Sequence, residues 1–144
     1  MNRVVNEFLH KFFYDYHQRL WDEVIRLIKE GVDLQNKHIN GIKTQAKKNI
    51  FKGLDVNFDC FGCFFVPQSE SNPCDFCFLL NIDNICTSWE DFWYETEYWF
   101  DNKLSVDDAI KKCKQIRDCG YRVVKDKRVY DKMMFLFNKI SGIE

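Results

Sequence analysis

The chain has 144 residues, of which 46% are hydrophobic and 30% charged, and these values are typical of one globular domain with a core. Only two prolines and six glycines are present, which excludes long linkers and extended disorder. The formal net charge of −1 excludes a general electrostatic attraction of the whole molecule to nucleic acid or anionic lipid.

Residues 3–30 are predicted to form one long amphipathic helix. Apolar or aromatic side chains recur at every fourth position and make a stripe at helical spacing: Val4, Phe8, Phe12, Tyr16, Leu20, Val24 and Ile28. Gly31 is suited to the position just after a helix C-terminus. We expect this face to pack into the core, with a partner-binding face as the alternative.

Residues 33–59 show weaker patterning. The Asn40-Gly41 pair predicts a turn, and residues 44–52 predict a short helix. Residues 54–58 alternate between apolar and polar side chains, which predicts a short strand leading to the first cysteine pair.

Four cysteines within residues 60–77 carry the strongest chemical signal. They form two Cys-x-x-Cys pairs with ten residues between the pairs: Cys60, Cys63, Cys74 and Cys77. Two such turns facing each other make a tetrahedral cage of four thiolates, which suits zinc and leaves no open position for water or substrate. We therefore expect a structural zinc ion. A redox dithiol and an iron–sulfur cluster are the alternatives, and Cys86 is either a substitute ligand or a buried thiol.

The segments that follow the two cysteine pairs are apolar. Residues 64–66 and 78–80 are predicted either to pair as short strands or to pack around the metal as a dry shell. The first alternative gives a zinc-knuckle β-hairpin within residues 54–86.

A helix is predicted to begin near residue 88, at a capping-box pattern, and to run to about residue 101. Seven aromatic side chains within it cannot all face one core, so some are predicted to be exposed as binding anchors. The predicted partner-binding residues are Trp89, Glu90, Asp91, Trp93, Glu95, Glu97 and Trp99. The alternative is a helix buried between two other elements.

The C-terminal part is predicted to hold a helix over residues 106–119, an extended segment over 121–124 and a helix over 127–140. The fold class is therefore mainly α (α+β), in one zinc-stabilised domain. Its parts are the long N-terminal helix in residues 1–32, the central zinc knuckles in 54–86 and three C-terminal helices in 88–141.

Basic side chains are frequent between residues 111 and 132. The predicted nucleic-acid-binding residues are Lys111, Lys112, Lys114, Arg117, Arg122, Lys125 and Arg128. Tyr121 and Tyr130 are available to stack on bases. The alternative is a solvated helix face that binds nothing.

Sequence motifs of common enzyme classes are missing from the chain, which has no Walker loop, no GxGxxG and no nucleophile elbow. Pro73 and the following cysteine pair match the second half of a zinc deaminase signature, but no His-x-Glu or Cys-x-Glu precedes them. We therefore expect no enzymatic activity.

No stretch approaches the ~20 apolar residues of a membrane span, and the N-terminal residues lack the apolar run of a signal peptide. We expect a cytoplasmic protein without a membrane partner. In that compartment, seven cysteines predict metal ligation and thiols, not a disulfide framework.

The run Cys60-x2-Cys63-x10-Cys74-x2-Cys77-x8-Cys86, with a Trp- and Tyr-rich stretch after it, resembles small uncharacterised proteins of bacteriophage genomes. The resemblance covers roughly residues 54–101, although Phe78 and Ser88 stand where many of those proteins have proline. It implies a structural metal and an origin in a phage or mobile element.

By analogy with small phage proteins, we expect a protein that binds a host protein. One concrete form is an anti-CRISPR-like inhibitor of a bacterial defence nuclease or another nucleic-acid-processing complex in the host cytoplasm. The alternative is a nucleic-acid-binding zinc protein, whose affinity would fall steeply with salt concentration.

Overall fold

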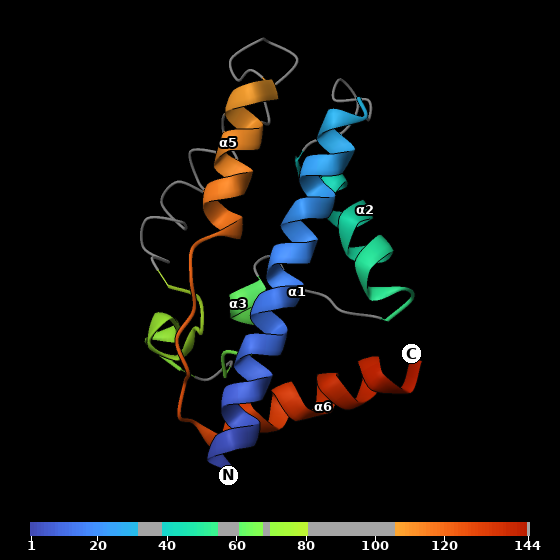
Figure 1. Cartoon of the computed structure of the whole chain (residues 1–144). Coiled ribbons are helices and arrows are strands. Elements are labelled where there is room, and N and C mark those ends of the chain that lie inside the picture. Colours follow the sequence, from blue (N-terminus) through green and yellow to red (C-terminus); the bar gives the residue numbers. More distant parts are fainter. Residues whose placement is uncertain (32–38, 55–60, 68–69, 81–105, 144) are drawn as a thin grey trace. The chain divides into compact units, whose positions relative to one another are not determined.

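A computed structural model describes residues 1–31, 39–54, 61–67, 70–80 and 106–143 (Figure 1). These residues are mainly helical, which confirms the predicted fold class at that level. The elements are α1 (Arg3–Lys29), α2 (Ile39–Phe51), α3 (Phe61–Phe64), the 3₁₀-helix η1 (Pro73–Phe76), α5 (Val106–Arg117) and α6 (Lys127–Ile143). The predicted helix of residues 88–101 lies outside the described residues, as does all but Leu54 of the strand predicted for residues 54–58.

The long N-terminal helix predicted from the apolar stripe is confirmed as α1. The side-chain oxygen of Asn2 accepts a hydrogen bond from the N–H of Val5 at 3.0 Å, which satisfies one of the unpaired donors at the helix start. Gly31 has a φ of 72°, a conformation that glycine adopts without strain, and it ends the helical path. In the part of the chain that the structure describes, no helix has the length and apolarity needed to cross a membrane.

Helix α2 begins at Ile39, five residues before the helix predicted for residues 44–52. The Asn40-Gly41 pair, predicted as a turn, is part of the helix. Ile42 and Ala46 lie four residues apart and are fully buried, so the burial of this face outweighs the weak helix propensity of asparagine and glycine.

The β-hairpin predicted at the cysteine pairs does not occur among the described residues. Cys63 of the first pair lies in the short helix α3, and in the second pair Cys74 lies in η1 and Cys77 directly follows it. Leu79 forms an isolated antiparallel bridge with Tyr121, a residue far along the chain, and not with residues 64–66. Residues 78–80 are therefore paired outside the knuckle region, and their packing around a metal as a dry shell stays a prediction.

The chain divides into two compact units. The first comprises Met1–His17, Leu54–Ile82 and Gly120–Glu144, and the second comprises Gln18–Gly53 and Asp83–Cys119. Helix α1 contributes its first half to one unit and its second half to the other.

The core of the first unit is rich in aromatic side chains. The ring of Phe13, on α1, lies 4.8 Å from the ring of Phe65 and 5.9 Å from that of Phe61, measured between centroids. Phe78 lies 5.8 Å from Phe65, and Met133 of α6 is fully buried. Since burial of each such side chain contributes about 1.5–3 kcal/mol, this cluster is a main source of stability for the segment that carries the cysteines.

In the second unit, α2 and α5 both contact the second half of α1 (Figure 1). Arg117 of α5 pairs with Asp22 of α1 at 2.7 Å, and the ammonium of Lys43 on α2 lies 5.8 Å from the ring centre of Trp21. The buried apolar side chains of this unit include Leu20, Val24, Ile28, Ile42, Ala46, Ala109, Cys113 and Ile116.

A buried histidine links α1 to the segment before α6 in the first unit. His10 is fully buried; its Nδ1 lies 2.7 Å from the carbonyl oxygen of Asn6, and its Nε2 accepts the N–H of Val124 at 3.0 Å. Because Nε2 must accept, the proton sits on Nδ1 and the imidazole is neutral. Burial lowers the pKa of His10 below its usual value of 6.5, and the contact with Asn6 opposes that shift.

Acidification below pH 6.5 should therefore destabilise the protein through His10. The unfolded chain binds the proton more readily than the folded one, so this contribution to stability is present above pH 6.5 and is lost as the pH falls. The slope should not exceed about 1.4 kcal/mol per pH unit. Urea unfolding at several pH values should show it, and the His10→Gln variant should flatten this part of the profile. An unchanged profile in that variant would contradict the assignment.

Candidate metal centre

Two of the predicted zinc ligands have described side chains, and both lie at the two short helical turns of the first unit. Cys63 belongs to α3 and is exposed, whereas Cys77 directly follows η1 and is buried. The side chains of Cys60, Cys74 and Cys86 lie outside the described residues. The structure thus places two of the candidate sulfur ligands, and the complete ligand set stays a prediction.

The sulfur of Cys77 lies against the main chain of the first cysteine pair. A Cβ added to Gly62 would stand 2.5 Å from Cys77 Sγ, closer than any real contact of that kind. Gly62 directly precedes Cys63, so the last sulfur of the second pair reaches the turn of the first pair. Among the described side chains, no three of His, Cys, Asp or Glu gather as metal ligands, and the contact at Gly62 places only the Cys77 sulfur against the first turn.

The neighbours of this contact exclude water. Phe61, Phe78 and Leu79 are at most 3% exposed, and the rings of Phe61 and Phe78 meet edge to face with centroids 6.1 Å apart. A dry apolar shell strengthens the bonds between thiolates and a metal and slows exchange with solvent. Cys77 therefore lies in apolar surroundings, whereas Cys63 is exposed.

The side chain of Arg122 binds main-chain carbonyl groups of the second cysteine turn. Its Nε donates to the carbonyl oxygen of Cys77 at 3.0 Å, and its Nη2 donates to that of Asp75 at 2.7 Å. Its own N–H donates to the carbonyl oxygen of Phe78 at 2.8 Å, next to the bridge at Leu79. One residue of the segment before α6 thus holds three carbonyl groups around the end of η1.

Two further cations of the same stretch reach the aromatic residues beside the cysteines. The guanidinium of Arg128 lies 5.2 Å from the ring centre of Phe76 and pairs with Glu70 at 2.7 Å. The ammonium of Lys132 lies 4.5 Å from the ring centre of Phe64. Phe76 precedes Cys77 and Phe64 follows Cys63, so cationic side chains stand near both turns.

Arg122 and Arg128, both predicted to bind nucleic acid, have structural partners within the chain. Both arginines bind groups of their own chain around the cysteine turns. The partners of Arg122 lie more than 40 residues earlier in the sequence, and neither spacing nor charge pattern signals such a contact. Sequence reasoning therefore missed them. Lys125, between them, is exposed.

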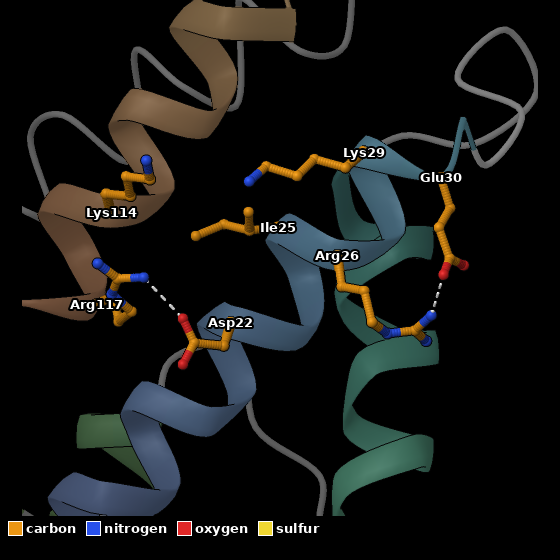
Figure 2. A pocket seen from close by; sticks show the side chains of 7 residues that line it. All are labelled: Asp22, Ile25, Arg26, Lys29, Glu30, Lys114 and Arg117. Atoms are coloured by element: carbon orange, nitrogen blue, oxygen red, sulfur yellow. Dashed lines mark hydrogen bonds and ion pairs between the residues drawn. The ribbon is translucent and has the colours of Figure 1, made fainter.

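The other predicted nucleic-acid residues lie on α5 in the second unit, beside a hollow of about 380 Å³ (Figure 2). Its lining residues are Asp22, Ile25, Arg26, Lys29, Glu30, Lys114 and Arg117. Arg117 is bound by Asp22 and Asp118, and Arg26 by Glu23 and Glu30, so acids offset the basic side chains. Lys29 lies in the last turn of α1 and Lys114 in the last turn of α5, where cations complement the helix dipole. Lys111 is exposed and Lys112 partly so, and the lining of the hollow holds four basic and two acidic side chains.

The predicted partner-binding residues 89–99 lie outside the described residues, so their exposure is not placed by the structure. No protein-family model matches the chain, and neither a curated protein nor a solved structure matches it. The resemblance to bacteriophage proteins accordingly remains a prediction from the cysteine spacing.

Proposed function

We propose that this chain is a small binding protein whose first unit is organised by a structural zinc ion held by Cys60, Cys63, Cys74 and Cys77. The single observation that carries the proposal is the contact of the Cys77 sulfur with Gly62 inside the first cysteine turn. A tetrahedral site needs the two cysteine turns to lie against each other, and this contact supports that arrangement.

The surroundings support a structural role for the metal over a catalytic one. When bound, zinc supplies a four-way cross-link between the two turns. The buried neighbours Phe61 and Phe78 keep water from the Cys77 sulfur, and Arg122 holds the main chain of the second turn. Four thiolates complete the coordination, so such a site stabilises the fold and does not activate a substrate.

The binding role is proposed for residues 89–99, in which Trp89, Trp93 and Trp99 alternate with acids. An acidic and aromatic surface suits a partner with a basic groove, such as a host protein that processes nucleic acid. Inhibition of a bacterial defence nuclease, as by an anti-CRISPR protein, is the concrete form. Capture of partners from a bacterial lysate should weaken when Trp93 and Trp99 are replaced by alanine, and equal capture by both proteins would contradict it.

Metal analysis tests the first part of the proposal. The untagged chain, purified without chelators, should contain one zinc ion per chain by elemental mass spectrometry. A chelator that removes the zinc should lower the unfolding temperature, because metal affinity contributes to folding free energy in such sites. A chain that holds no metal after purification and after incubation with zinc would refute the structural zinc centre.

A further inference from the structure

We infer that Arg122 is the positioning residue of this metal centre and that its guanidinium controls how fast the metal leaves. The inference rests on the proposed zinc site. It gives a structural role to a residue that the basic run of residues 111–132 predicts to bind nucleic acid.

The contacts of Arg122 span the second cysteine turn. Its Nε and Nη2 reach the carbonyl oxygens of Cys77 and Asp75, which lie two residues apart on either side of Phe76. The direction of the Cα–Cβ bond of Cys77 follows from the main chain on both sides of it. Holding these two carbonyls therefore fixes the direction of that bond and limits the positions that the Cys77 sulfur can reach.

The position of that sulfur leaves little freedom. Cys77 Sγ rests where a side chain on Gly62 would begin, and Leu79 Cδ1 lies 3.1 Å from the same point. A small rotation of the second turn would therefore move the sulfur into the first turn or away from it. A metal bound by four sulfurs is sensitive to such a shift, because groups that orient the ligands typically change metal affinity about 10–100-fold.

The two donors must come from one planar, always charged group. A guanidinium presents its N–H groups in a fixed fork and binds two acceptors at once, whereas the lysine ammonium is a single point on a flexible chain. Lysine at this position would keep the positive charge near the thiolates but would not hold both carbonyls. The arginine-to-lysine change therefore separates charge from geometry.

Tyr14 offers a matched control in the same segment. Its hydroxyl oxygen accepts the N–H of Gly120 at 2.8 Å, and Gly120 lies two residues before Arg122. The Tyr14→Phe variant loosens this segment while it leaves both contacts of Arg122 to the cysteine turn in place. An effect that comes only from loss of stability would appear in both variants.

The experiment uses the full chain loaded with zinc and measures the first-order rate of zinc transfer to an excess of a coloured chelator. The Arg122→Gln variant should release zinc about 10–100-fold faster than the parent, and Arg122→Lys should fall between them. Tyr14→Phe should release zinc at the parent rate. With cobalt in place of zinc, the absorption bands of the thiolate-bound ion should shift in Arg122→Gln and stay unchanged in Tyr14→Phe.

The outcomes separate the two levels of the proposal. A parent chain that takes up neither zinc nor cobalt overturns the proposed metal centre itself. A parent and an Arg122→Gln variant that both bind one metal and release it at equal rates, with equal cobalt spectra, overturn the role of Arg122 alone. If Arg122→Gln does not fold, Arg122→Lys decides: faster release supports the inference and a parent-like rate overturns it.

Discussion

The Cys77→Ser variant should lose its zinc and unfold at a much lower temperature than the parent chain. A serine hydroxyl stays neutral at pH 7 and is a poor zinc ligand, so one corner of the tetrahedral site is lost. Zinc in such sites contributes on the order of 10 kcal/mol to folding, which is comparable with the whole stability of a typical domain. Elemental analysis and thermal unfolding followed by circular dichroism should show both losses together.

Cys113→Ser is the matched control for this prediction. Cys113 is also a fully buried cysteine, but it lies on α5 in the second unit and is not a predicted ligand. Burial raises its pKa to about 12, so it remains a neutral thiol that packs as a small apolar group. Its replacement should cost about 1–3 kcal/mol for the buried hydroxyl and leave the zinc content unchanged. Equal zinc content in the two serine variants would show that Cys77 is not a ligand.

Helices with a strong local pattern could be predicted closely from the sequence. The apolar stripe predicted residues 3–30 as a helix, and α1 spans Arg3–Lys29. Helix α6 begins at Lys127 as predicted, because Asp126 caps its start by accepting the N–H groups of Arg128 and Val129. The spacing of apolar residues and the capping residue at a helix start are local signals, so a single sequence contains them.

Contacts between distant segments could not be predicted in this way. The apolar residues after the second cysteine pair fit a hairpin by local pattern, but Leu79 pairs with Tyr121 of a segment about 40 residues later. The role of Arg122 depends on the same meeting of segments. From the sequence alone, a basic side chain is predicted to be a surface charge. The carbonyl groups that it binds become known only from its position in the fold.

Gly62→Ala should weaken zinc binding about tenfold or more, although helix propensity alone favours the change by about 1 kcal/mol. Gly62 lies within α3, and the backbone there accepts alanine. The obstacle is the sulfur of Cys77, 2.5 Å from the new Cβ, where carbon and sulfur need well over 3 Å. A free thiol relieves only part of the clash by rotating, because Cys77 is buried, and a sulfur bound to a metal cannot rotate at all. The metal therefore turns the clash into a loss of affinity. Zinc competition with a chelator of known affinity measures it.

Two further variants show whether the sulfur is the cause. Gly142→Ala on α6 is the control for helix propensity, because nothing lies within 4 Å of its added Cβ, and it should bind zinc as the parent does. In zinc-free protein, Gly62→Ala should lower the free energy of unfolding less in a Cys77→Ala background than in the parent chain, because that background lacks the clashing sulfur. The difference between the two effects is the coupling energy between the two positions. Gly62→Ala and Gly142→Ala variants with equal zinc affinity would mean that no metal holds the Cys77 sulfur against the first turn. The zinc centre would then have to be built without Cys77.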